Sequence, residues 1–217
     1  MAVRALEFSQ AHPDDSDGYR VALQQLEEQV ALSDQLADQQ REGMAEVRAA
    51  TARKRDLIRV MRRRQLVHLA RVAQRAAREL PELAQKFDLP RLPIPYLAFI
   101  SGARTMAAEA RRHTELLIKH GLVERILDGL ERSLDQFDRA VEQGSEGRRV
   151  HIGASARLDS LANDMVQLVG VIDGANRDRF ADDRDLMTTW KSASKVVVPR
   201  RGSGLRVIDG GATDEAA

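Results

Sequence analysis

A long stretch without proline does most to limit what this chain can fold into. Residues 16–79 contain no proline and two glycines, of which only Gly43 lies away from the start. Uninterrupted, such a helix would be roughly 95 Å long at 1.5 Å per residue. Ser16 is a residue type favoured at helix N-caps, and Pro81 ends the segment. We therefore expect one very long helix over residues 16–80.

The positions of this helix that would face a coiled-coil partner, here called the seam, are not apolar throughout. Apolar residues at its two ends follow the alternating spacing of a coiled coil, whereas the middle of the seam is polar. Imperfect, coiled-coil-like pairing with a kink near Gly43 is therefore expected. The alternative is two separate helices broken at residues 41–43.

Residues 19–40 have one narrow apolar face, formed by Leu23, Leu26 and Val30. The remaining side chains of this half are mostly Gln, Asp, Glu and Ser. Because isolated helices depend on burial of an apolar face, we expect a second chain to stabilise this half.

Charge is distributed unevenly along the same segment. Residues 14–42 carry eight acidic and two basic side chains, a net charge of −6, whereas residues 45–79 carry eleven basic and three acidic ones, a net charge of +8. Beyond Arg64 the apolar residues rotate to another side, so a change of packing partner is expected there. On a helical wheel, five arginines share one side and are called the ridge: Arg48, Arg55, Arg59, Arg62 and Arg63.

Three interpretations of the ridge are open. In a dimer of antiparallel copies it would face the acidic half of the second chain, with Glu27, Glu28 and Asp34. Alternatively it binds the phosphates of a nucleic acid, although the basic half has no aromatic residues for base stacking. The third interpretation is a solvated face without a partner.

Residues 93–197 are expected to form a helical bundle. One helix should run to about Lys119, where Gly121 makes a break. The apolar spacing then predicts two helices, separated by QGSEG at residues 143–147. A loop over residues 174–183 and a short helix with Trp190 follow, and we expect Phe180 and Trp190 to be core anchors.

The two ends of the chain are expected to be irregular. Residues 1–15 are predicted to be flexible and have no secretory signal, while residues 198–217 are predicted to be a disordered tail. A hairpin over residues 196–209 is the alternative. The chain has no cysteine and no apolar stretch of about 20 residues, so a soluble, cytoplasmic protein that does not enter a membrane is expected.

Catalytic chemistry is not evident in the sequence. None of the five histidines lies in a metal-binding pattern, although Glu109, His113 and His120 could share a helix face. The acidic residues 173–185 do not fit the spacing of a calcium loop. We therefore expect no catalytic residue, metal, cofactor or small-molecule site.

These patterns together predict an all-α helical bundle with a very long N-terminal helix, a short C-terminal helix and a flexible tail. With 43% apolar and only 4% aromatic residues, the core should be built from aliphatic side chains on helices. The expected function is that of a non-enzymatic scaffold that self-associates or binds a partner protein through its charge-polarised helix. A nucleic-acid-associated protein using the ridge is the alternative.

Overall fold

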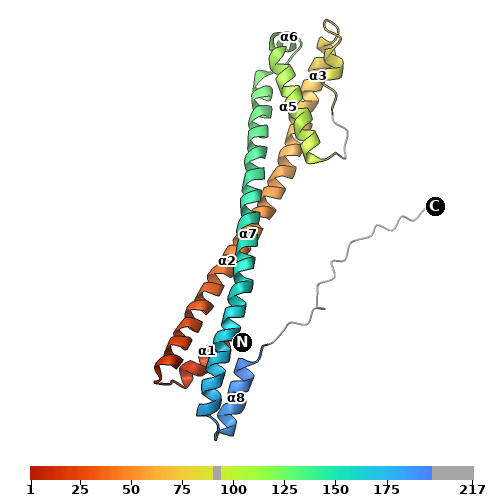
Figure 1. Ribbon diagram of the computed structural model, residues 1–217. Coiled ribbons are helices and arrows are strands. Elements are labelled where there is room, and N and C mark those ends of the chain that lie inside the picture. The colour runs from red at the N-terminus through yellow and green to blue at the C-terminus, as the bar shows by residue number, and fades with distance from the viewer. Residues whose placement is uncertain (90–93, 197–217) are drawn as a thin grey trace, which may run out of the picture. The chain divides into compact units, whose positions relative to one another are not determined.

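The computed structural model describes residues 1–89 and 94–196 (Figure 1). Within these residues every regular element is a helix, which confirms the predicted fold class. The predicted tail and nearly all of the alternative hairpin lie outside the described residues. The elements in chain order are α1 (Ala2–Ala11), α2 (Asp17–Val60), the π-helical η1 (Met61–Leu66), α3 (Val67–Ala76), α4 (Leu83–Lys86), α5 (Tyr96–Arg112), α6 (Thr114–Lys119), α7 (Glu124–Arg179) and α8 (Arg184–Ser194).

The helices form two compact units, each built from segments that are distant in the sequence. Of the described residues, the terminal unit comprises 1–33 and 160–196, and the central unit comprises 34–89 and 94–159. Both α2 and α7 contribute to each unit. This division differs from the expected separation of a long helix from a bundle over residues 93–197, because α2 packs against α7.

The terminal unit has an apolar core to which α1, α2, α7 and α8 contribute. Trp190 is 0% exposed, and its indole N–H donates a hydrogen bond to Asp173 over 2.7 Å. Asp183 caps α8 by accepting hydrogen bonds from two backbone N–H groups. Phe180 and Trp190 are thus core anchors, as predicted. The loop predicted from residue 174 begins only after Arg179, where α7 ends.

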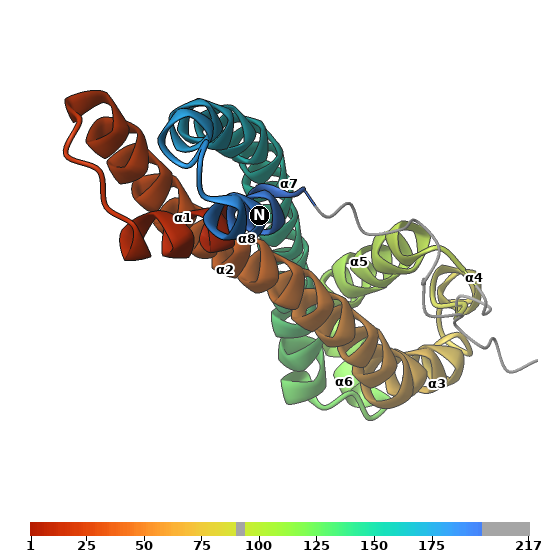
Figure 2. The same cartoon turned by 90° about the horizontal axis from the view of Figure 1, so that it is seen from below.

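The predicted flexible segment over residues 1–15 is largely helical instead. Ala5 and Phe8 of α1 are buried, and the Phe8 ring lies 5.3 Å from the Trp190 ring between centroids. Figures 1 and 2 show α1 and α8 side by side. A helix this short is ordered by its packing partner, and α8 comes from the other end of the sequence, so the local pattern did not reveal the contact.

Two glycines bring α2 and α7 into backbone contact in the central unit. A Cβ atom added at Gly43 would lie 2.6 Å from the carbonyl oxygen of Gly147. One added at Gly147 would lie 2.8 Å from the carbonyl oxygen of Gly43. Both helices continue through these positions. The predicted break at residues 143–147 and the alternative break at residues 41–43 are therefore wrong, because the glycines allow close helix packing.

The change of packing partner predicted near Arg64 falls at η1. A π-helical turn holds more residues than an α-helical turn, so side chains beyond it are rotated about the axis. Met61 and Leu66 at the two ends of η1 are fully buried. They belong to the main core of the central unit, which α3, α4, α5, α6 and the first part of α7 complete. Figure 2 shows α3, α4 and α5 next to one another in this unit.

Gly121 ends α6 as predicted. Its φ is 105°, a left-handed conformation that favours glycine. The N–H groups of Gly121 and Leu122 donate to the carbonyl oxygens of Ile118 and Leu117 over 2.9 and 2.8 Å. This arrangement satisfies carbonyl groups that a helix end leaves open. The single helix predicted before this turn is divided at His113 into α5 and α6.

Candidate interaction surfaces

The ridge lies on the surface of the central unit. Arg48, Arg55, Arg59 and Arg63 are exposed, and Arg62 is half-buried. Arg59 forms an exposed ion pair with Asp56 at 3.0 Å, one turn before it on the same helix. At 100° per residue, the ridge arginines of α2 lie about 140–180° from Ala50, which packs beside Gly144 of α7. The three ridge arginines of α2 therefore point away from the α2–α7 contact, and the other two, Arg62 and Arg63, lie in η1.

The residues predicted to mediate self-association are divided between core and surface. Leu26 is 0% exposed, and Leu23 and Val30 pack around the same core of the terminal unit. This chain itself supplies the burial that was expected from a second chain. The acidic members are exposed and available to a partner: Glu27, Glu28 and Asp34.

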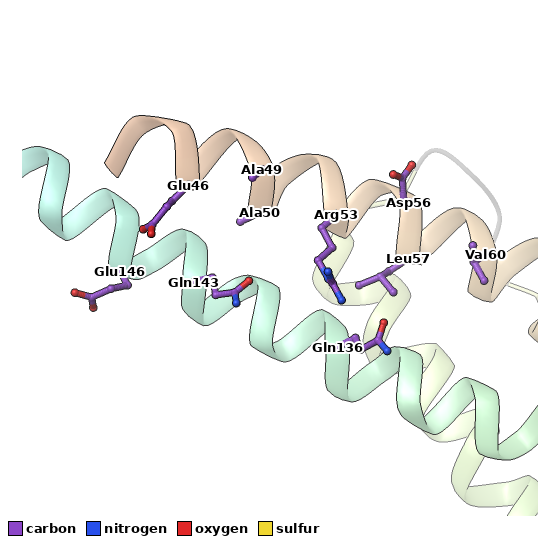
Figure 3. A pocket seen from close by; sticks show the side chains of 10 residues that line it. All are labelled: Glu46, Ala49, Ala50, Arg53, Asp56, Leu57, Val60, Gln136, Gln143 and Glu146. Atoms are coloured by element: carbon purple, nitrogen blue, oxygen red, sulfur yellow. The ribbon is translucent and has the colours of Figure 1, made fainter. Parts of the chain in front are cut away.

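A groove between α2 and α7 lies in the central unit, next to the glycine contact (Figure 3). Its cavity volume is about 720 Å³. Ala49, Ala50, Leu57 and Val60 of α2 form its apolar part. The polar part consists of the remaining side chains labelled in Figure 3: Glu46, Arg53, Asp56, Gln136, Gln143 and Glu146.

The sequence-based reasoning did not predict this groove. The α2 side chains that line it recur at intervals of three and four residues from Glu46 to Val60, which places them on one helix face. The spacing was therefore a usable signal. Spacing does not reveal the opposite wall, because the glycines at residues 143–147 predict a helix break and so give no reason to place these α7 residues beside α2.

A second charged site lies where α4 meets α5. Glu109 is buried, and its carboxylate accepts hydrogen bonds from Lys86 at 3.1 Å and from Arg112 at 2.7 Å. His113 lies 3.7 Å from the same carboxylate. The hydrogen bond from Lys86, with the nearby positive charges, lowers the pKa of Glu109 from its ordinary value of 4.5. Glu109 therefore connects α4 to α5 as an ionised carboxylate.

The lowered pKa of Glu109 predicts a stability that depends on pH. A carboxylate whose pKa is lower in the folded than in the unfolded chain stabilises the fold above pH 4.5, and this contribution is lost as the pH falls through 4.5 and below. We expect Glu109→Gln to be less stable than the wild type at neutral pH and to differ little from it in acid. Urea unfolding at pH 7 and pH 3 measures this. Glu115→Gln, at an exposed position of α6, is the control, and equal pH dependence in wild type and Glu109→Gln would contradict the expectation.

The histidines proposed to share a face are separated by the structure. Glu109 and His113 come together, whereas His120 lies 3.0 Å from the Glu79 carboxylate, which also accepts a hydrogen bond from Lys119 at 2.9 Å. In residues 1–89 and 94–196, no three His, Asp or Glu side chains are grouped so that they could hold a metal ion. No helix in this part of the chain has the length and apolar character needed to cross a membrane.

No protein-family model, no curated protein and no solved structure matches this chain. What it binds is therefore inferred from its own surfaces. Two of them are the ridge and the groove, and the ridge arginines of α2 lie on a different side of this helix from the groove.

Proposed function

We propose that this chain is a non-enzymatic helical interaction protein whose partner contacts the ridge. The observation that carries the proposal is the position of Arg48, Arg55 and Arg59, which are exposed on the side of α2 opposite its contact with α7. Arg63 is exposed in η1, which follows directly. Because the ridge arginines project from a packed helix, the backbone fixes the order and spacing of the positions from which their guanidinium groups extend. Arginine forms bidentate hydrogen bonds with both carboxylates and phosphates. The acidic half of α2 would repel phosphates, so an acidic protein segment is the partner that fits best.

A second copy of this chain offers such an acidic segment. Glu27, Glu28 and Asp34 are exposed on the acidic half of α2. Their carboxylates could face the ridge of an antiparallel copy, in a dimer whose orientation is set by charge. The apolar residues Leu23 and Leu26 take no part in this contact, because their own chain covers them. We also propose a cytoplasmic location, which fits a chain without cysteine.

Nucleic acid is the second candidate partner. It is favoured by the number of exposed arginines between Arg48 and Arg63, which span roughly 22 Å along the helix axis. Such a row could contact the phosphate backbone and release counterions. The residues between them include no aromatic side chain for stacking on bases, so binding would be independent of sequence.

Charge reversal of the ridge tests both candidates. We expect the triple variant Arg48→Glu, Arg55→Glu, Arg63→Glu to lose self-association, because like charges placed together at an interface cost several kcal/mol. Light scattering at low salt measures the mass. A matched control carries the same charge change on exposed positions of α7: Arg132→Glu, Arg139→Glu and Arg148→Glu.

Three outcomes distinguish the candidates. Partial recovery of the mass when Glu27→Arg, Glu28→Arg and Asp34→Arg are added would support pairing between copies. Binding of a DNA or RNA strand that weakens steeply with salt and is lost on reversal, with unchanged mass, would favour nucleic acid instead. If reversal changes neither mass nor binding, the ridge is a solvated face and the proposal is wrong.

A further inference from the structure

We propose that the groove between α2 and α7 is a docking site for an amphipathic helix of a partner protein, with lysine or arginine along its edges. The groove is distinct from the ridge. Around the α2 axis, Arg53 and Val60 lie in the middle of the lining face, and Arg48, Arg55 and Arg59 lie roughly 100–160° from them. Partner binding in the groove therefore goes beyond the proposed function of the ridge.

The origin of the groove is the spacing between its two helices. Gly43 and Gly147 hold the backbones in contact at one end. Beyond this contact, Figure 3 shows the lining side chains along both α2 and α7. Ala50 and Leu57 are partly or fully covered by their own chain, whereas other lining side chains remain accessible. The Val60 side chain is 37% exposed, and Ala49 is also exposed.

The shape of the groove fits a helix. On α2 the lining extends from Glu46 to Val60, which corresponds to roughly 21 Å at 1.5 Å per residue. A helix of about four turns has this length. Ala49 is small and exposed, so the backbone of a third helix could approach α2 closely there. The lining of α2 repeats every three and four residues, as does a face that packs against another helix.

The charge of the groove determines which side chains fit beside the apolar face of the partner helix. Its polar side chains include three carboxylates, Glu46, Asp56 and Glu146, and one basic group, Arg53. The lining residues alone carry a net charge of −2, and two of their carboxylates, Asp56 and Glu146, form exposed ion pairs with Arg59 and Arg149 one turn away on their own helices. Gln136 and Gln143 add uncharged donors and acceptors on the α7 wall. A helix with an apolar stripe and basic edges matches this arrangement, whereas acidic edges would be repelled.

Two synthetic peptides are the probes for this site. Each is about 15 residues long, which matches the groove, and carries leucine and alanine along one helical face. One has lysine and the other glutamate beside this face. With the full-length chain at physiological salt, fluorescence anisotropy should show the lysine peptide binding at least about tenfold more tightly than the glutamate peptide, a difference of about 1.4 kcal/mol.

Two variants of the same type locate the binding. Ala49→Leu fills the groove from an exposed position, and we expect it to weaken binding of the lysine peptide by at least about tenfold. Ala52→Leu adds the same side chain at an exposed position of α2 outside the groove and should bind like the wild type. Asp56→Asn combined with Glu146→Gln should reduce the preference for lysine edges. Circular dichroism establishes that each variant is folded.

Several results would overturn the proposal. The wild type could bind neither peptide or bind both equally, or the Ala49→Leu variant could bind the lysine peptide as tightly as the wild type does. A wild-type dimer that Ala49→Leu converts to a monomer would assign the groove to a second copy instead. The ridge reversal should leave peptide binding intact, so failure of the groove proposal and failure of the ridge proposal are distinguishable.

Discussion

Replacing Trp190 with alanine is expected to lower the free energy of unfolding of the terminal unit by about 3–5 kcal/mol. The indole is fully buried, and its ring lies near that of Phe8, which connects α8 to α1. Truncation removes this packing and leaves Asp173 without the indole N–H as a donor. Urea unfolding followed by circular dichroism measures the change.

Trp190→Phe separates packing from hydrogen bonding in this core. It keeps an aromatic ring but loses the bond to Asp173, whose carboxylate still accepts from Arg177 at 2.6 Å. A smaller loss is expected, on the order of 1–3 kcal/mol. Tyr96→Ala, at an exposed position, is the control for removal of a ring. A loss below about 1 kcal/mol for Trp190→Ala would show that α8 does not depend on this contact.

Replacing Gly147 with alanine is the second change with a large expected effect. In an open helix position this substitution stabilises by roughly 1 kcal/mol, since alanine has the higher helix propensity. Here the new Cβ atom would meet the Gly43 carbonyl oxygen and the Glu46 Cβ, each at 2.8 Å. We expect a net loss of about 1–3 kcal/mol, because backbone and side chains of α2 must shift.

Gly153→Ala is the matched control on the same helix. A Cβ atom at Gly153 would meet no atom within 4 Å, so this variant should gain about 0.5–1 kcal/mol. Thermal unfolding of both variants beside the wild type measures the two opposite signs. If both substitutions stabilise, α2 and α7 are not in backbone contact at this point.

Some features of the fold were predictable because their cause is local. The left-handed turn at Gly121 follows from a glycine directly after a helical segment. The rotation of apolar residues near Arg64 is visible in the sequence because η1 shifts the packing face. The long helix itself follows from the absence of proline. In each case, a few neighbouring residues contain the necessary information.

Other features depend on contacts between distant segments. Glycines such as Gly144 and Gly147 are typical of turns. They lie inside α7 because α2 packs directly against them. The apolar face around Leu26 predicts a second chain, whereas its cover comes from α1, α7 and α8 of the same chain. The groove was missed for the same reason. The ridge could be predicted as a set of residues, since a helix face depends on spacing alone.

A dilution series tests most directly whether the chain covers its own apolar surface and meets partners through the ridge. Light scattering and circular dichroism are measured on the same samples, at low and high salt. We expect a mass above that of one chain at low salt, falling to one chain as salt rises or concentration falls, with an unchanged helical signal. A helical signal that decreases together with the mass would contradict this, because the helix containing Leu26 would then depend on a second chain for its burial.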